Sequence, residues 1–289
     1  MEPRNLTLEP TVTFSNSQMP ALITNTGQKI PQLGLGVYKV TPDIGVDLVR
    51  LAIGNGYRRI DTAALYDNEP EIGAGVRTSG VDREELFVTT KIWNDRQGYP
   101  EVFDAVEESL NRLNIGYLDM LLIHWPAPAQ GKFVETWRAF EELLDKGRVR
   151  GIGVSNFNPE HIEELIESSN VIPAINQVEL HPGLQQAEVR AINQKFGILT
   201  EAWSPLARAR MNDEGVIQSI SSRTGKTPAQ VILRWHIQLG NLVIPKSSNP
   251  DRLSENIDVF DFELTETDMA SIATLENGNR IGPNPADFS

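Results

Sequence analysis

Along most of its length the chain alternates between short apolar runs and longer segments in which apolar residues recur at helical spacing. The apolar runs lie at residues 33–36, 59–61, 86–91, 120–124, 151–155, 174–179, 199–203 and 242–244. The helical segments lie at residues 43–55, 69–79, 101–113, 133–146, 160–168, 186–196 and 228–239. Short buried strands that alternate with helices form parallel sheets, because each helix carries the chain back to the starting edge. The pattern therefore predicts an α/β fold.

Two architectures fit this alternation, an open doubly wound sheet and a closed (β/α)8 TIM barrel. Eight units of roughly 30 residues fill about 240 residues, which is the usual size of the barrel. We therefore expect a single barrel domain over residues 21–289, with the open sheet as the alternative. The turn-forming sequence NTG at 25–27 predicts a small hairpin within residues 22–32, and a short C-terminal tail ends the chain. Residues 1–20 are polar and aperiodic and are expected to form a poorly ordered tail.

Composition removes several classes of function. The formal net charge of −13 argues against a nucleic-acid binder or a polybasic membrane anchor, so any anionic ligand needs locally concentrated cations. The absence of cysteine excludes disulfides, thiolate metal sites and a cysteine nucleophile. The four histidines lack metal-ligand spacing, so no metal is expected. No apolar run approaches the ~18 residues of a membrane helix, and no secretory signal opens the chain. We expect a cytoplasmic monomer that acts on a small molecule.

Two glycine pairs resemble part of a nucleotide-binding fingerprint but do not complete it. The sequences GLG at 34–36 and GIG at 151–153 lack the third glycine, because Lys39 and Asn156 stand at that spacing. An open-sheet nicotinamide enzyme is therefore not supported.

Four polar side chains stand where barrel chemistry is expected, at the carboxyl ends of neighbouring strands. Asp61, Lys91 and His124 close three successive apolar runs, and Tyr66 lies in the loop after Asp61. Each residue alone is typical of packing or of a salt bridge at the barrel rim. Together they are expected to converge on one site, because their strands are neighbours.

These four residue types suit the protonation of an oxygen. A phenol with a pKa of ~10 is a poor proton donor at neutral pH, and a neighbouring ammonium group lowers that pKa. Asp61 would hold the Lys91 ammonium beside Tyr66, and His124 would bind a carbonyl oxygen. Hydride addition to a carbonyl places negative charge on such an oxygen.

Six motifs in order along the chain resemble the aldo-keto reductase family, from about residue 22 onward. They are GYRRIDTAALY at 56–66, TKIW at 90–93, LIHWP at 122–126, GIGVSNF at 151–157, NQVELHP at 176–182 and IPKS at 244–247. Within the family the chain is most similar to the microbial 2,5-diketo-D-gluconate reductase group, on WND at 93–95 and ENIDVF at 255–260.

The resemblance implies roles for individual residues. The catalytic tetrad would be Asp61, Tyr66, Lys91 and His124, with Tyr66 as the general acid in reduction. The cofactor NADP(H) would be held by residues at the nicotinamide, pyrophosphate and adenosine phosphate positions, namely Ser155, Asn156, Gln177, Trp203, Ser204, Leu206, Lys246, Ser247, Ser248, Asn249, Arg252, Glu255 and Asn256. Substrate contacts would come from Tyr38, Trp93, Trp125 and His124.

Local charge agrees with this assignment. Lys246 and Arg252 stand with hydroxyl donors beside a helix start, which is an anion site that an acidic chain would not otherwise offer. Arg208 could contact the cofactor or attract a substrate carboxylate. The connecting segments 126–133 and 207–215 are short, as is the tail at 277–289. They indicate an open pocket and a small polar carbonyl substrate, such as a 2-keto or diketo acid or a sugar.

The leading hypothesis is an NADP(H)-dependent reductase of aldehydes or ketones. A Schiff-base aldolase that uses Lys91 is a second hypothesis, although pairing with Asp61 would keep this lysine charged and non-nucleophilic. A third is a protein that binds NADPH without meaningful turnover.

Overall fold

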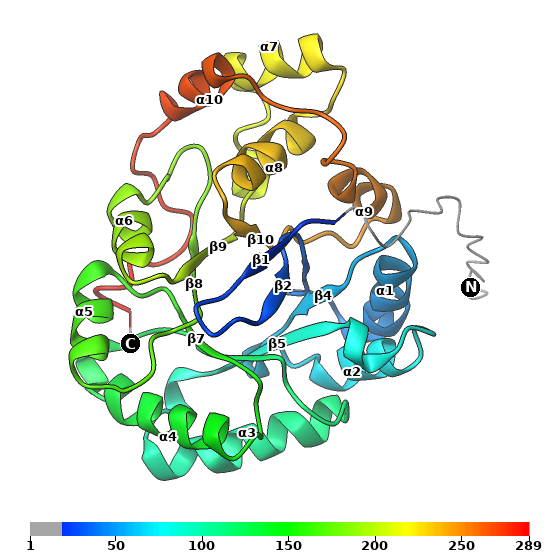
Figure 1. The fold of residues 1–289 in the computed structure, drawn as a ribbon. Helices are drawn as coiled ribbons and strands as arrows, with labels where there is room; N and C mark the ends of the chain where they lie inside the picture. Colours follow the sequence, from blue (N-terminus) through cyan, green and yellow to red (C-terminus); the bar gives the residue numbers. More distant parts are fainter. Residues whose placement is uncertain (1–18, 289) are drawn as a thin grey trace.

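The structure, a computed structural model, describes residues 19–288 (Figure 1). The tail predicted at residues 1–20 lies outside the described residues except for Met19 and Pro20. Within the described part of the chain, no helix is long and apolar enough to cross a lipid bilayer.

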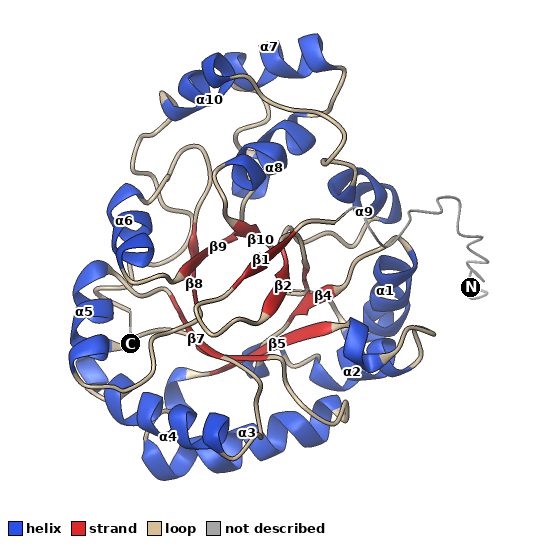
Figure 2. Cartoon of the chain, viewed as in Figure 1, coloured by secondary structure: helices blue, strands red, loops and turns tan. Residues whose placement is uncertain are grey.

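Eight parallel strands form the centre of the molecule, and helices surround them (Figure 2). The strands are β3 (Leu35–Gly36), β4 (Arg59–Asp61), β5 (Phe87–Ile92), β6 (Met120–Ile123), β7 (Ile152–Ser155), β8 (Ile175–Glu179), β9 (Leu199–Trp203) and β10 (Leu242–Val243). Each pairs in parallel with the next strand along the chain. A parallel bridge between Leu33 and Val243 joins the first and last strand regions, so the sheet closes. The predicted (β/α)8 barrel is confirmed, and the open-sheet alternative is wrong.

Two glycines permit this closure. A Cβ atom at Gly36 would lie 2.9 Å from the carbonyl oxygen of Ile244, and one at Gly34 would lie 2.6 Å from Nε of Arg59. The backbone N–H of Gly34 donates to the carbonyl of Val243 at 2.8 Å, which ties the two edges together. The glycines at 34 and 36, which do not complete a nucleotide-binding fingerprint, therefore allow the two edge strands to approach each other closely.

The predicted hairpin is present and covers one end of the barrel. It consists of β1 (Ala21–Ile23) and β2 (Lys29–Pro31), which pair antiparallel and lie across the strands in Figure 1. Ile30 packs with Phe87, Met120 and Leu242, which are the first residues of β5, β6 and β10. The hairpin thus closes the amino ends of the strands, and the carboxyl ends remain for chemistry.

The helices form the outer layer of the barrel. They are α1 (Pro42–Gly54), α2 (Glu69–Arg77), α3 (Tyr99–Leu113), α4 (Phe133–Asp145), α5 (Pro159–Glu167), α6 (Ala187–Lys195), α7 (Gly215–Thr224), α8 (Pro228–Gln238), α9 (Pro250–Ile257) and α10 (Glu266–Ala273). All seven predicted helical segments are helices. The elements α7, α9 and α10 are additional, and α7 is rich in serine and β-branched residues, which form helices weakly.

Several helices begin with a proline, which has no N–H to leave unpaired in the first turn. These include α1 at Pro42, α5 at Pro159 and α8 at Pro228. In α8 the hydroxyl of Thr227 accepts from the N–H of Gln230, whose side chain accepts from the N–H of Thr227. This reciprocal cap fixes where α8 starts.

Substitution of Gly36 by alanine is expected to lower the free energy of unfolding by about 1–3 kcal/mol, because the new Cβ would overlap the Ile244 carbonyl. Urea unfolding measures the change. The matched control is Gly54→Ala in α1, where nothing lies within 4 Å and alanine should be neutral or stabilising. Equal stability of the two variants would contradict the proposed closure role of Gly36.

Candidate active site

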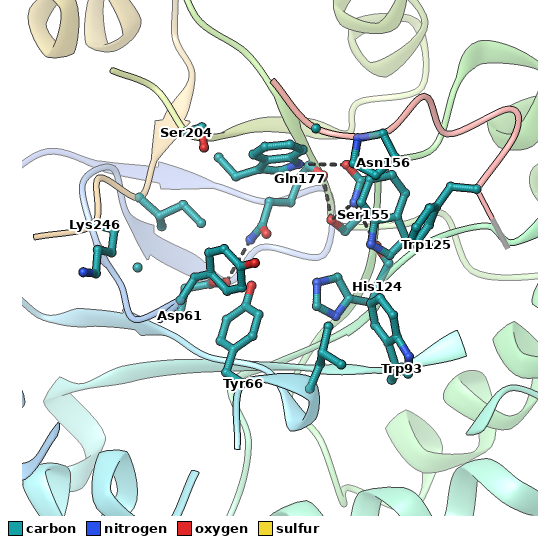
Figure 3. Close-up of a pocket in the computed structure, with 18 of the residues that line it drawn as sticks. Asp61, Tyr66, Trp93, His124, Trp125, Ser155, Asn156, Gln177, Ser204 and Lys246 are labelled. Atoms are coloured by element: carbon teal, nitrogen blue, oxygen red, sulfur yellow. Dashed lines mark hydrogen bonds between the residues drawn. The ribbon is translucent and has the colours of Figure 1, made fainter. Parts of the chain in front are cut away.

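The four predicted catalytic side chains meet at the carboxyl ends of β4, β5 and β6. Asp61 is the last residue of β4, His124 follows β6, and Tyr66 ends a short 3-10 turn at Ala64–Tyr66. These three line one cavity of about 280 Å³, in which they face one another (Figure 3). Lys91 of β5 lies behind the cavity wall and has no exposed surface.

The Lys91 ammonium group is held by three oxygen atoms. Its Nζ donates to Oδ1 of Asp61 at 2.5 Å, to the carbonyl of Thr62 at 2.9 Å and to the Tyr66 hydroxyl at 3.5 Å. An ammonium group has three N–H bonds, so each has an acceptor. Lys91 therefore presents its charge to Tyr66 from a fixed position.

The protonation states follow from burial and from this contact. Burial lowers the pKa of Lys91, but Asp61, Tyr66 and Glu201 raise it more, so the lysine is charged at neutral pH. Burial raises the pKa of the Tyr66 phenol, and the Lys91 charge lowers it by less. Lys91 does lower the pKa of Tyr66, as the sequence predicts. The net shift is nevertheless upward, because burial raises this pKa by more than Lys91 lowers it. Tyr66 therefore keeps its proton.

His124 is a neutral imidazole in this site. Burial lowers its pKa well below the usual value, and the Lys91 charge lowers it further. Within residues 19–288, Nδ1 of His124 is buried and has no hydrogen-bond partner. The ring packs edge-on against Tyr66 and Trp93, with centroid distances of 5.7 and 5.0 Å. The other ring nitrogen, Nε2, is the one left to meet a ligand.

The predicted nicotinamide residues form a connected wall on β7, β8 and β9. Nδ2 of Asn156 donates to the carbonyl of His124 at 2.9 Å and to Oγ of Ser155 at 3.1 Å. Its Oδ1 accepts from Nε1 of Trp203 at 2.8 Å (Figure 3). Nε2 of Gln177 donates to Oδ2 of Asp61 at 2.8 Å. The amide wall is thus joined to the tetrad.

Aromatic side chains form the outer wall of the cavity. The predicted substrate residues Tyr38, Trp93 and Trp125 all line it. Phe288, which no sequence motif indicates, also lines it and packs against Trp125 and Trp93 at centroid distances of 4.5 and 6.1 Å. The short tail predicts an open pocket, but in the structure this tail covers part of the pocket and narrows it.

A buried carboxylate holds this tail in place. Glu179, at the end of β8, accepts hydrogen bonds from the backbone N–H groups of Ile281 and Gly282 at 2.5 and 2.9 Å. His181 lies 3.1 Å from the same carboxylate. A Cβ at Gly282 would be 2.5 Å from the ring of Trp203, so only glycine lets the tail lie so close.

A second cavity of about 460 Å³ adjoins the first, because Arg208 and Lys246 line both. Of the predicted cofactor residues, it is lined by Leu206, Lys246, Ser247, Arg252, Glu255 and Asn256. Ser204 lines the first cavity. Among the described residues, the cations Arg208, Lys246 and Arg252 form no ion pair with a carboxylate. Although the chain is acidic overall, the second cavity therefore carries positive charge that no carboxylate of the described residues neutralises by an ion pair.

The two remaining predicted residues lie beside the second cavity rather than in its wall. Oγ of Ser248 accepts from the Lys246 ammonium at 3.5 Å. Oδ1 of Asn249 caps α9 by accepting from the N–H groups of Asp251 and Arg252 at 2.8 and 3.2 Å. Asn249 is thus already engaged as a helix cap.

Comparison with known proteins agrees with the geometry. The family model described as Aldo/keto reductase family matches residues 32–277. An aldo-keto reductase of Mycolicibacterium smegmatis is 53% identical over 270 residues, covering 93% of this chain and 98% of the relative. Glyoxal reductase of Bacillus subtilis is 48% identical over 276 residues, covering 93% and 99%.

A solved structure supports the same relationship. A variant of Gox0644 in complex with NADPH superposes with a TM-score of 0.90 at 45% identity and covers 94% of this chain and 99% of its own. With the family match across most of the barrel, these similarities show that the chain belongs to the aldo/keto reductase family.

Proposed function

We propose that this enzyme reduces aldehydes or ketones with NADPH and that Tyr66 donates the proton. The observation that carries the proposal is the geometry of the cavity, where the Tyr66 phenol faces the His124 imidazole and Nζ of Lys91 lies 3.5 Å behind the phenol oxygen. The barrel domain over residues 21–289 would carry the whole activity. The cytoplasmic location, the monomeric state and the lack of a nucleic-acid partner expected from the sequence stay predictions.

The residues around the two adjoining cavities fit NADP(H). The unpaired cations Arg208, Lys246 and Arg252 suit its phosphates, and the amides of Asn156 and Gln177 suit the nicotinamide carboxamide. When bound, the cofactor supplies the hydride. Ser155, Trp203 and Ser204 would complete the nicotinamide side, and Leu206, Ser247, Ser248, Asn249, Glu255 and Asn256 would complete the adenosine side.

The protein's own groups manage the proton. A carbonyl oxygen between Tyr66 and His124 would accept hydrogen bonds from the phenol O–H and from an N–H on Nε2 of the imidazole. As negative charge grows on this oxygen, the Tyr66 O–H bond breaks and an alcohol O–H bond forms. Lys91 stabilises the resulting phenolate until solvent returns a proton. The aromatic walls of Trp93 and Trp125 exclude competing water.

The charged lysine that this scheme requires argues against the Schiff-base alternative. A Schiff base needs a neutral amine, whereas Asp61 and two further oxygens hold Lys91 as an ammonium group. Reduction with borohydride in the presence of a ketone should therefore leave Lys91 unmodified.

The proposed substrates are small polar carbonyl compounds, including 2-keto acids, diketo acids and sugars. The cavity of about 280 Å³ supports small compounds, and its polar lining residues Tyr66, His124 and Asn156 support polar ones. The resemblance of residues 93–95 and 255–260 to the microbial 2,5-diketo-D-gluconate reductases supports the same class. A carbonyl panel assayed with NADPH and NADH would rank the candidates.

Substitution of Tyr66 by phenylalanine is expected to lower kcat/KM for a reactive aldehyde by about 10²–10⁴, because the proton donor is removed. The dissociation constant of NADPH should change little. The matched control is Tyr57→Phe, which removes a buried hydroxyl that donates to the Leu253 carbonyl at 3.0 Å and lines neither cavity. Near-normal turnover by the Tyr66 variant would refute its role as proton donor. Tight NADPH binding with negligible turnover by the wild type on every carbonyl would favour the non-catalytic alternative.

Substitution of Lys246 and Arg252 by alanine is expected to weaken NADPH binding about tenfold or more while changing NADH binding little, because only NADPH carries the extra phosphate. Fluorescence titration measures both affinities. Lys226→Ala is the matched control, because its ammonium is nearby and already paired with Asp258 and Asp261 at 3.0 and 2.7 Å. Equal losses for both cofactors would disprove the phosphate assignment.

The pH dependence of reduction follows from the two shifted groups. Tyr66 is active when protonated, so activity is lost as pH rises through its raised pKa. His124 becomes charged only well below its usual pKa. We therefore expect kcat/KM to stay flat between about pH 6 and 9. A decline between about pH 7 and 6 would show that His124 titrates near its ordinary value, against this assignment.

A further inference from the structure

A buried ion pair joins two strands that do not pair with each other, β4 and β9, which are each second from one end of the strand order. Nη1 of Arg59, on β4, lies 2.9 Å from Oε1 of Glu201, on β9. The exposed fractions of the two residues are 0% and 1%. A buried ion pair is often no more stabilising than two apolar residues of the same size, so stability alone does not account for it.

Both partners are fixed by further hydrogen bonds. Nη2 of Arg59 donates to the carbonyl of Val243 at 2.8 Å and to that of Gln32 at 3.4 Å, where the barrel closes. Oε1 of Glu201 faces Arg59, so the other carboxylate oxygen, Oε2, is free to face Gln177. Gln177 is the residue opposite Glu201 in the pairing of β8 and β9. Oε2 accepts from Nε2 of Gln177 at 3.0 Å.

These contacts determine which way the Gln177 amide points. Its Nε2 has two N–H bonds, and they are used by Glu201 and by Asp61 at 2.8 Å. The reversed amide would place an oxygen against two carboxylates. Among residues 19–288 the Gln177 side chain forms its hydrogen bonds through Nε2, and the side chain lines the catalytic cavity, where Oε1 has no hydrogen-bond donor from the protein. Gln177 therefore offers a hydrogen-bond acceptor to a ligand (Figure 3).

We propose that Glu201, anchored by Arg59, is a positioning residue that keeps Oε1 of Gln177 turned into the cavity to accept the carboxamide N–H of NADP(H). Asp61 alone could hold one N–H of the Gln177 amide, but a single acceptor leaves the side chain free to rotate about that bond. The second carboxylate removes this freedom. This inference rests on the proposed function, since it assumes that the nicotinamide lies beside Gln177.

The test compares equilibrium binding of two reduced cofactors. NADPH has the carboxamide, whereas its 3-acetylpyridine analogue has a methyl ketone and so no N–H to donate. Tryptophan fluorescence gives both dissociation constants without turnover. For wild type we expect tighter binding of NADPH. For Glu201→Gln, whose amide can turn an N–H toward Gln177, we expect NADPH binding to weaken about fivefold to tenfold and analogue binding to stay unchanged.

Glu201→Gln leaves the Arg59 charge buried without its carboxylate and so endangers folding. A second variant covers the case in which Glu201→Gln does not fold. The double variant Arg59→Leu/Glu201→Leu removes both charges. The carbonyls of Gln32 and Val243 keep their backbone donors, which are the N–H groups of Val243 and Gly34. We expect this variant to fold and still to lose the preference for NADPH. Retention of the full wild-type preference would overturn the proposal, because the pair would then be structural only.

The reference variant Gln177→Met separates this proposal from the one on which it rests. We expect it to lose the preference for NADPH, and addition of Glu201→Gln to it should cause no further change, because the two act through one contact. If Gln177→Met alone keeps the preference, the assignment of Gln177 to the carboxamide fails. If it loses the preference while the Glu201 variants keep it, only the role of Glu201 fails.

Discussion

A fully buried ammonium group is the constraint on which the site depends. Taking a lysine charge out of water costs several kcal/mol, and the loss is offset only when a carboxylate and further acceptors surround it. Lys91 has Asp61, the Thr62 carbonyl and the Tyr66 hydroxyl as these partners. A substitution of Asp61 therefore affects both folding and chemistry, since it leaves an uncompensated charge beside the cavity.

The same burial sets the protonation of the neighbours. A phenol that is removed from water keeps its proton, and an imidazole that is removed from water and faces a cation stays neutral. The cavity thus presents two neutral hydrogen-bond donors backed by one positive charge. In the proposed reaction this arrangement would stabilise a developing oxyanion more than a neutral carbonyl. Such a difference between transition state and ground state accelerates a reaction.

The sequence predicts the barrel and the tetrad because both depend on local patterns. Strand and helix periods identify the eight units, and Asp61, Lys91 and His124 each end an apolar run. The hairpin follows from its turn residues. The closure of the sheet by Gly34 and Gly36 could not be inferred, because the contact partners of these glycines lie elsewhere in the chain.

Other features depend on contacts that no local pattern reports. Phe288 lies in an aperiodic tail, and its place between two tryptophans follows only from the hydrogen bonds of Glu179 to the tail. Arg59 and Glu201 lie within predicted strands, but their pairing follows only from the closed barrel, which brings side chains of β4 and β9 together. The direction of the Tyr66 pKa shift could not be predicted from its neighbours alone, because it also depends on how deeply the phenol is buried.

The two cavities would bind the cofactor through two kinds of interaction, attraction by charged side chains near solvent and hydrogen bonds from buried amides. Arg208, Lys246 and Arg252 lie near solvent without carboxylate partners, so their attraction for phosphates is long-ranged and is weakened by salt. Gln177 and Asn156 lie buried, where hydrogen bonds depend on geometry and little on ionic strength. A protein with a net charge of −13 can therefore attract an anionic cofactor through a few local cations. In the proposed complex, neutral amides would set the orientation of the reacting ring, and they place no additional net charge beside Lys91 and Tyr66.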